Sequence, residues 1–351
     1  MSRTLGYGII GCGRIFRNHA ASVAADARAR LLAVADVKPE ARERARAEFG
    51  AAAYADYTEL LARPDVAAVS ICLPHHLHEA AVIAAAEAGK HVLCEKPLAL
   101  NGEQAARMIR ACREHSVTLG VVLQNRWNEA TRKVLDALRQ GRFGLISAGN
   151  MIQAAWKDDA YYADDWHGRW ATEGGGALLT QAIHTLDLLC LFIGRPLAVA
   201  AHCRTLAHRA EVEDVCSASI RFDGGAVGAV CVTNCAHGGW RLRLELLGAR
   251  GCAAIEDNRI VRWDFADRRP EDTLVGGEDA SDTPIGAPGY GVGHRRLIAD
   301  FISSVLGGTP FAVPGEEGLK VSEVIWAAYR SARSGCEEPV AAPYEDQGLQ
   351  N

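Results

Sequence analysis

Residues 5–14 have the sequence LGYGIIGCGR, a short apolar run that leads directly into a pair of glycines. A helical pattern follows at once, over Arg14–Ala25. A strand, a glycine-rich turn and a helix in this order are typical of the start of a dinucleotide-binding unit. Gly11 would permit the tight turn, and Gly13 would let the backbone approach a pyrophosphate at the helix N-terminus. Phe16 stands where the third glycine is expected, so the fingerprint is incomplete.

Asp36 strengthens this interpretation, because it follows the second expected strand, Leu31–Ala35. A carboxylate at this place accepts hydrogen bonds from the ribose hydroxyls of NAD, and it repels the 2′-phosphate of NADP. Lys38 is close enough in sequence to weaken that repulsion. We therefore expect NAD as the cofactor and NADP as the less favoured alternative. An ordinary strand–turn–helix with a capping aspartate is the alternative without a cofactor.

The pattern of short apolar runs and helical segments continues to about residue 123. Strands are expected at Leu5–Ile10, Leu31–Ala35, Ala68–Leu73, His91–Cys94 and Thr118–Leu123. Helices are expected at Arg14–Ala25, Pro39–Phe49, His78–Ala88 and Gly102–His115. This alternation predicts right-handed βαβ units on a parallel sheet, and hence an N-terminal Rossmann domain over residues 1–123.

After Gln124 the pattern changes, and residues 124–351 are expected to form a C-terminal α+β domain. Its helices are expected at Glu129–Gln140, Ala177–Ile193, His294–Leu306 and Glu316–Ser334, and its strands at Leu145–Gln153, Cys216–Phe222, Ala226–Asn234, Arg241–Leu247 and Ala253–Phe265. Such a run of strands predicts a large open, mostly antiparallel sheet. Residues 267–293 are rich in Gly, Pro, Asp and Ser and suggest a long loop, either functional or disordered.

Composition limits the class of protein. A chain of 351 residues is longer than one ordinary core, in agreement with two domains. The net charge of -5 gives no electrostatic reason to expect a nucleic-acid partner. Most of the 11 cysteines lie in apolar runs, as reduced thiols do in a cytosolic protein. The N-terminus enters a strand at once and no apolar run reaches membrane-spanning length, so a soluble, cytoplasmic protein is expected.

Two further segments carry side chains suited to redox chemistry: Cys94–Pro97, and Glu173–Gly176 followed by Thr180, His184 and Asp187. Hydride transfer from an alcohol carbon to nicotinamide leaves an oxygen that must lose its proton. An imidazole, with an ordinary pKa of about 6.5, is suited to take that proton. An ammonium group nearby would stabilise the developing alkoxide. We therefore expect His184 as acid/base and Lys96 as its electrostatic and proton-relay partner.

The spacing of Thr180, His184 and Asp187 is i, i+4 and i+7, which places them on one helix face. Asp187 could then orient His184, and Thr180 could bond the substrate or the imidazole. Aromatic and polar residues around this helix could stack on a sugar and bond its hydroxyls. Among them we expect Arg126, Trp166 and His167 to contact the substrate, although ordinary packing is the alternative.

These motifs together resemble the glucose–fructose oxidoreductase / inositol dehydrogenase / MocA (Gfo/Idh/MocA) family, over essentially the whole chain. The resemblance is carried by Gly11–Arg14, Pro74 with His78, Glu95–Pro97, Gln124–Arg126, and Gly174–Gly176 with His184 and Asp187. It implies a Rossmann domain that binds the nicotinamide cofactor, and a second domain whose open sheet forms much of the subunit interface. A homodimer or homotetramer that oxidises or reduces a sugar or polyol carbon is therefore expected.

Carried over by position, Lys96 matches the family's active-site lysine, and Pro97 the proline often joined to it by a cis peptide. His184 matches the catalytic histidine. Many members carry an aspartate four residues before that histidine, where this chain has Thr180, our third catalytic candidate. The expected substrate contacts are Lys96, Arg126, Trp166, His167, Thr180 and His184. The expected cofactor contacts are Gly11, Gly13, Arg14, Ile15, Asp36, Leu73, Pro74, His78, Glu95, Lys96 and Asn125.

Other functions were weighed against this hypothesis. A metal site is not expected, because no carboxylate or cysteine completes the cluster of His75, His76 and His78 at ligand spacing. An NAD-using glycosidase or lyase with redox-assisted elimination is the alternative enzyme. A non-catalytic dinucleotide-sensing regulator is a further alternative, but it would not need both Lys96 and His184.

Overall fold

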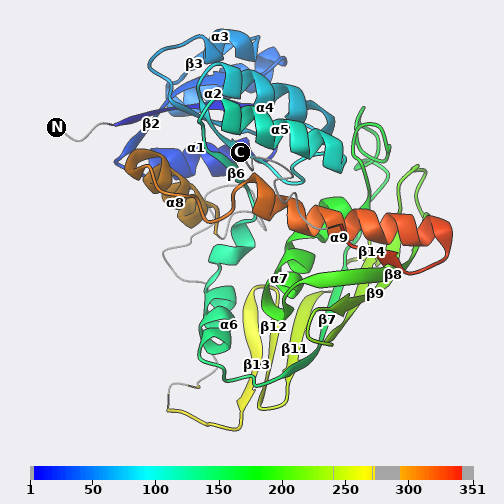
Figure 1. Cartoon of the computed structure of the whole chain (residues 1–351). Coiled ribbons are helices and arrows are strands. Elements are labelled where there is room, and N and C mark those ends of the chain that lie inside the picture. Colours follow the sequence, from blue (N-terminus) through cyan, green and yellow to red (C-terminus); the bar gives the residue numbers. More distant parts are fainter. Residues whose placement is uncertain (1–3, 240, 271, 273–292, 342–351) are drawn as a thin grey trace, which may run out of the picture. The chain divides into compact units, whose positions relative to one another are not determined.

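The computed structural model describes residues 4–239, 241–270, 272 and 293–341, which fall into two compact units (Figure 1). The first unit contains the described parts of Met1–Gln124 and Ser281–Leu319. The second contains those of Asn125–Ala280 and Lys320–Asn351. Most of the predicted loop at residues 267–293 lies outside the described residues.

The first unit is built on a six-stranded sheet in the order β3-β2-β1-β4-β5-β6. Its strands are β1 (Leu5–Ile10), β2 (Ala29–Ala35), β3 (Ala52–Tyr54), β4 (Ala68–Ile71), β5 (His91–Cys94) and β6 (Leu119–Val121). Its helices are α1 (Phe16–Ala24), α2 (Pro39–Phe49), α3 (Tyr57–Leu61), α4 (His78–Glu87), α5 (Gly102–Glu114) and α8 (His294–Gly307). All the strand pairs are parallel, so the predicted Rossmann architecture is confirmed. The short elements β3 and α3 were not predicted.

Helix α8 belongs to the first unit, although the sequence analysis placed everything after residue 123 in the second domain. It packs on α1 and buries an apolar stripe that includes Leu297 and Phe301. Arg28 adds bonds from its guanidinium to the Ala299 carbonyl and the Ser303 hydroxyl. The two placements differ because an amphipathic stripe shows that a helix covers a core but not which core it covers.

The second unit contains an eight-stranded sheet in the order β13-β12-β11-β7-β10-β9-β8-β14. Its strands are β7 (Ile146–Ala154), β8 (Pro196–Arg204), β9 (Val215–Phe222), β10 (Val227–Thr233), β11 (Leu242–Gly248), β12 (Gly251–Glu256), β13 (Arg259–Phe265) and β14 (Glu338–Pro339). The helices are α6 (Glu129–Arg139) and α7 (Ile183–Ile193), and α9 (Gly315–Ser334) has residues in both units. Only the β7–β10 pair of this sheet is parallel, which confirms the mostly antiparallel sheet.

Two predicted elements are divided in the structure. The expected strand Ala253–Phe265 is a hairpin of β12 and β13, with Asp257 and Asn258 at φ values of 46° and 66° in the turn. Two consecutive residues with positive φ form the turn whose twist matches paired strands. The expected helix Ala177–Ile193 consists of a π-helical turn, Ala177–Gln181, followed by α7.

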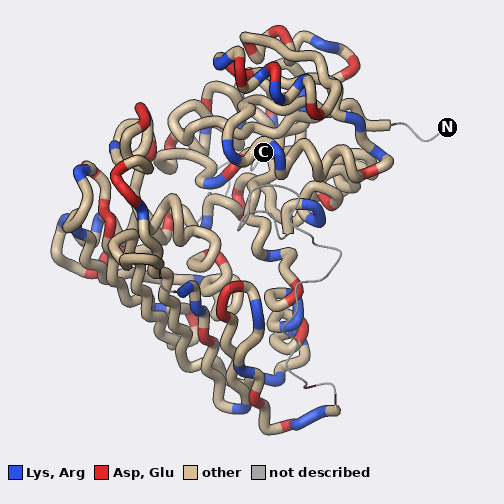
Figure 2. The backbone as a smooth tube through the Cα atoms, turned by 180° about the vertical axis from the view of Figure 1, so that it is seen from behind, with Lys and Arg blue, Asp and Glu red and all other residues tan. Residues whose placement is uncertain are grey.

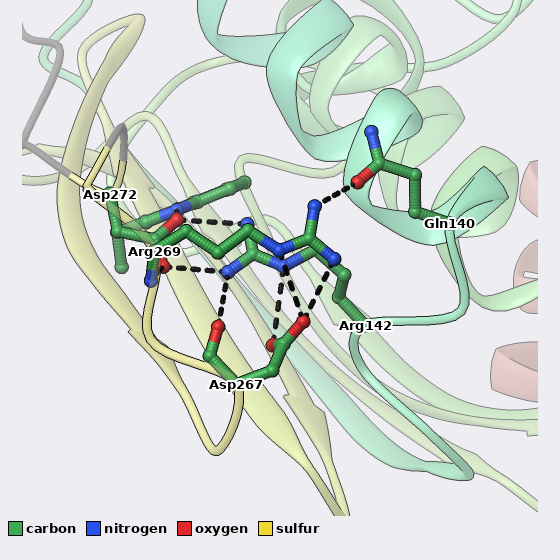
Figure 3. Close-up of polar contacts among 6 residues, drawn as sticks. Gln140, Arg142, Asp267, Arg269 and Asp272 are labelled. Atoms are coloured by element: carbon green, nitrogen blue, oxygen red, sulfur yellow. Dashed lines mark hydrogen bonds and ion pairs between the residues drawn. The ribbon is translucent and has the colours of Figure 1, made fainter.

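A polar cluster fastens the segment after the edge strand β13 to the end of α6 (Figure 3). The buried Arg142 donates to both carboxylate oxygens of Asp272, at 2.8 and 2.6 Å, and its guanidinium lies over the Phe265 ring. Arg269 bonds Asp267 and the side-chain oxygen of Gln140. The hydrogen bonds from Arg142 hold the pKa of Asp272 well below its usual range. The edge strand is therefore tied down by charged groups that are bonded to one another.

Basic and acidic residues are interspersed along the described chain (Figure 2). The mixture agrees with the small net charge of -5. Within the described residues, no helix combines the length and the apolar character that crossing a bilayer requires.

Candidate functional site

The predicted cofactor residues of the first unit gather at one edge of its parallel sheet. They follow the carboxyl ends of β1, β2, β4 and β5: Gly11, Gly13, Arg14, Ile15, Asp36, Leu73, Pro74, His78, Glu95 and Lys96. Ligands of open α/β sheets bind at this edge. Asn125 is carried by the short 3₁₀ turn Gln124–Trp127 and is grouped with the second unit.

The glycine turn and Asp36 form one structure. Gly11 has a φ of 96°, and a Cβ there would lie 2.3 Å from the Cys72 carbonyl oxygen, so only glycine fits. The Asp36 carboxylate accepts the backbone N–H of Cys12 at 2.7 Å and that of Lys38 at 2.8 Å. Asp36 is thus held against the turn, where its remaining lone pairs suit ribose hydroxyls. A Cβ on Gly13 would meet no protein atom within 4 Å, which leaves room for a phosphate group.

We expect Asp36→Ser to weaken NAD binding by roughly 10- to 100-fold, because hydrogen bonds to a charged group contribute about 1.5–3 kcal/mol. The affinity for NADP should fall less than that for NAD, or rise, because the repulsion of its 2′-phosphate disappears. Fluorescence titrations with both cofactors measure the ratio of the two dissociation constants. Asp65→Ser, which alters a carboxylate paired with Arg63 in the same unit, is the control. An unchanged NAD-to-NADP ratio in Asp36→Ser would remove Asp36 from the ribose site.

The loops after β4 and β5 are joined by His78. Its Nε2 lies 2.9 Å from the Leu73 carbonyl oxygen, and its Nδ1 lies 2.9 Å from that of Pro97. Burial lowers the pKa of His78, so the neutral ring donates its single N–H to one of the two carbonyls. The Lys96–Pro97 peptide bond in the loop after β5 is cis, as expected. Both ring nitrogens of His78 face protein carbonyls, so this side chain supports the loop that carries Lys96.

In the second unit, the turn that leads to His184 is held by two buried carboxylates, Glu173 and Glu213. Glu213 accepts the backbone N–H groups of Gly176 and Leu178, both at 2.8 Å, and the Tyr329 hydroxyl at 2.9 Å. A Cβ on Gly176 would lie 1.9 Å from the Glu213 carbonyl oxygen, so this close approach requires glycine. Close packing within the unit therefore explains why glycine is needed in this turn.

Glu173 binds the catalytic candidate Thr180. The Thr180 hydroxyl donates to Glu173 Oε1 at 2.7 Å, and the Gly168 N–H donates to Oε2 at 2.6 Å. The family's usual aspartate is absent at position 180, but a carboxylate is present one hydrogen bond away. Sequence reasoning assigned no role to Glu173 or Glu213. The only signal for Glu173 was its place beside the glycines, and Glu213 lies in an acidic stretch, residues 211–214, that does not single it out.

We expect the stability of the protein to fall as pH rises through neutrality. Burial raises the pKa of both Glu173 and Glu213 to about 7. The folded state then binds more protons than the unfolded state between about pH 4.5 and 7, so the free energy of unfolding decreases across this range, by about 3 kcal/mol for each carboxyl group. The thermal unfolding midpoint, measured between about pH 5 and 8, reports this loss.

Glu173→Gln should flatten that pH dependence, because the amide does not titrate. Glu43→Gln, which changes an exposed carboxylate of the first unit, should leave it unchanged. A slope that is equal in Glu173→Gln and the wild type would show that Glu173 is ionised over the whole range.

Asp187 is bonded to Arg126. The Arg126 Nε and Nη2 atoms donate to the two carboxylate oxygens, at 2.7 and 2.5 Å, and both side chains are largely buried. Asp187 was expected to orient His184 and Arg126 to contact the substrate. The structure shows a bidentate ion pair that ties the 3₁₀ turn Gln124–Trp127 to α7, and both expectations stay predictions.

The aromatic candidates Trp166 and His167 lie in one stacked group. Their ring centroids are 3.6 Å apart, and the ring centroid of Tyr161 lies 4.2 Å from that of His167. Asp164 bonds His167 Nδ1, while the Gln181 amide donates to the Tyr161 hydroxyl at 2.9 Å. The group is thus connected to the turn that carries Thr180.

Two groups of described side chains could hold a metal ion: His19, Glu95 and His294, and His208, Asp214 and Cys235. In the first group His19 Nε2 already bonds Glu95 at 2.9 Å. In the second, the His208 ring bonds Asp214 and the Lys157 carbonyl through its two nitrogens. Hydrogen bonds within the protein thus engage His19 and Glu95 in the first group, and His208 and Asp214 in the second.

Models of known families match most of the chain. Residues 5–123 match an oxidoreductase family with an NAD-binding Rossmann fold, named GFO_IDH_MocA, and residues 131–254 match the GFO/IDH/MocA C-terminal domain. Myo-inositol 2-dehydrogenase of Thermotoga maritima is 30% identical over 335 residues, 92% of this chain and 95% of that protein. Levoglucosan dehydrogenase of Pseudarthrobacter phenanthrenivorans is 29% identical over 85% of this chain and 86% of its own length.

Solved structures are similar over nearly the whole length. The WlbA dehydrogenase of Bordetella pertussis, in complex with NADH and UDP-GlcNAcA, has a TM-score of 0.87 and 34% identity, covering 97% of this chain and 99% of its own. Levoglucosan dehydrogenase in complex with NADH and levoglucosan has a TM-score of 0.85 and 27% identity, covering 96% and 100%.

Proposed function

Because the chain belongs to the Gfo/Idh/MocA family of NAD-binding oxidoreductases, we propose that it transfers a hydride between a hydroxyl-bearing carbon of a sugar or polyol and nicotinamide. The protein is an NAD-dependent dehydrogenase or reductase. One observation carries the choice of substrate class. Over 97% of its length the chain is similar to a dehydrogenase solved with NADH and a nucleotide sugar.

In the proposed mechanism, NAD held by the first unit would supply the hydride acceptor, and the residues of the chain manage the proton. The His184 imidazole takes the proton of the reacting hydroxyl, and returns it when the reaction runs toward reduction. The Lys96 ammonium stabilises the alkoxide that forms between these states. Thr180, fixed by Glu173, bonds a substrate hydroxyl.

The remaining proposed contacts are those expected from the sequence. The cofactor is held by Gly11, Gly13, Arg14, Ile15, Asp36, Leu73, Pro74, His78, Glu95, Lys96 and Asn125. The substrate is contacted by Lys96, Arg126, Trp166, His167, Thr180 and His184. For Arg126 this requires the guanidinium to bind substrate while paired with Asp187.

We also propose a homodimer or homotetramer, formed through the open face of the second unit's sheet. Gly149 and Gly228 lie against leucine side chains of α7, so this helix covers one face. By alternation along β10, the side chains of Val227, Ala229 and Cys231 point to the opposite face, and all three are exposed.

The test is a screen of purified protein with NAD against sugars and polyols, including myo-inositol, levoglucosan and a nucleotide sugar acid, with NADH absorbance as the readout. Cofactor that co-purifies is measured first. A substrate that yields NADH supports the proposal. Substrate consumed without net NADH would indicate redox-assisted elimination. NAD binding with no substrate consumed would indicate a sensor.

A further inference from the structure

A chain of buried polar groups in the first unit ends at the backbone of Lys96. The Tyr7 hydroxyl lies 2.9 Å from Ser70 Oγ, which lies 2.8 Å from His19 Nδ1. His19 Nε2 lies 2.9 Å from Glu95 Oε1. The other oxygen of Glu95 accepts the Lys96 backbone N–H at 3.2 Å. These groups come from β1, β4, α1 and the residue that follows β5, and Tyr7, Ser70 and His19 are fully buried.

With a neutral His19 ring, one arrangement of protons satisfies every bond of this chain. Burial alone would raise the pKa of Glu95, but the hydrogen bond from His19 and the neighbouring His294 ring hold it well below its usual range. An ionised carboxylate only accepts, so His19 carries its proton on Nε2. Its Nδ1 then accepts from Ser70, and Ser70 accepts from Tyr7. All the hydrogen bonds then donate in the same direction, from Tyr7 toward the Glu95 carboxylate.

His294, the first residue of α8, completes the surroundings of this carboxylate. Its Nε2 lies 3.8 Å from Glu95 Oε1, and its ring meets that of His19 edge to face, with centroids 5.7 Å apart. It is 2% exposed. Burial lowers the pKa of His294, and the Lys96 ammonium adds to this effect. His294, about 200 positions from Glu95 in sequence, thus lies beside the same carboxylate as His19.

We propose that His19 and His294 are positioning residues, which hold the Glu95 carboxylate and, through it, the backbone of Lys96. The inference rests on the proposed function of Lys96. Removing a partner of a buried carboxylate leaves charge uncompensated, and the carboxylate must shift toward other donors. A displacement of about 1 Å in a reacting group lowers rates by about 100-fold, so the effect falls on kcat.

Two substitutions of His19 separate its two bonds. In His19→Gln the amide nitrogen takes the place of Nε2 and can still donate to Glu95. In His19→Asn the shorter side chain can bond Ser70 but does not reach Glu95. We expect kcat to fall about 10- to 100-fold in His19→Asn, and less than about threefold in His19→Gln, with the NAD dissociation constant unchanged in both. His91→Gln, at the other end of β5, is the control.

Equal kcat values in the two His19 variants would overturn the inference, because the bond to Glu95 would then be irrelevant to turnover. Parallel loss of kcat and of NAD binding in His19→Asn would overturn it as well, since the role would be structural. Thermal unfolding midpoints of both variants show whether any difference in kcat follows stability instead.

A measurement without substrate distinguishes this inference from the proposed function. Reductive methylation with ¹³C-formaldehyde labels the lysines, and the Lys96 signal is assigned by its absence in Lys96→Arg. Its titration midpoint should shift by about 0.5 pH unit or more in His19→Asn and in His294→Leu, but not in His91→Gln. Identical Lys96 midpoints in the wild type and these variants would contradict the inference. If the wild type turns over no sugar but the variants show these shifts, only the proposed function is contradicted.

Discussion

Replacing His184 by alanine is expected to lower kcat by a factor of about 10²–10⁴, the range over which general acid–base catalysis contributes. NAD should bind with near wild-type affinity, because the glycine turn and Asp36 are built entirely within the first unit whereas His184 lies on α7 of the second. Steady-state kinetics and a fluorescence titration of NAD, made on the same preparation, measure the two quantities.

The matched control for this variant is His202→Ala, which removes an exposed histidine from β8 of the same unit. It should leave kcat unchanged. If His184→Ala loses NAD binding together with activity, His184 is a structural residue. If it keeps its activity, another group takes the proton, and Glu173 through Thr180 becomes the first candidate to examine.

Replacing Lys96 by methionine is expected to lower kcat by a factor of about 10²–10³, because one preorganised group that stabilises a developing oxyanion contributes about 2.7–4 kcal/mol. Methionine keeps an unbranched side chain of similar length and removes the charge together with the N–H donors. The loss should grow as pH falls, since without the ammonium the hydroxyl gives up its proton less readily. A pH profile of kcat for Lys96→Met and the wild type measures both effects.

Lys96→Arg is the companion variant. It keeps a positive charge but spreads it over a planar group that does not occupy the same point. Partial activity in Lys96→Arg with little in Lys96→Met would support an electrostatic role. Equal and full activity in all three proteins would exclude Lys96 from the reaction.

Local sequence signals predicted the first unit well because its chemistry is encoded next to its strands. The glycine pair follows β1 directly, Asp36 follows β2 and Lys96 follows β5. In a parallel sheet all these carboxyl ends lie on one edge, so naming the strands also places the residues. The same reasoning does not place α8, whose apolar stripe is compatible with either core.

The second unit was harder to predict where a side chain's partner is distant in the chain. The spacing of His184 and Asp187 suggested a pair on one helix face, but Arg126 bonds both oxygens of Asp187 from 61 positions away. The β12–β13 hairpin was taken for one strand because its turn, Asp257–Asn258, contains no glycine. Positive φ at aspartate and asparagine is permitted and gives a weaker sequence signal than glycine does.

The sequence by itself determined the two architectures, the NAD-binding edge and the identity of the residues proposed for hydride and proton transfer, because each depends on short-range periodicity or on a motif a few residues long. Tertiary structure alone decided which buried groups support them: Glu213 and Glu173 at the turn before His184, and His19 with His294 around the carboxylate beside Lys96. Those partners are set by burial, since a charged group removed from water must find hydrogen bonds from whichever element the fold brings to it, however far away in the chain.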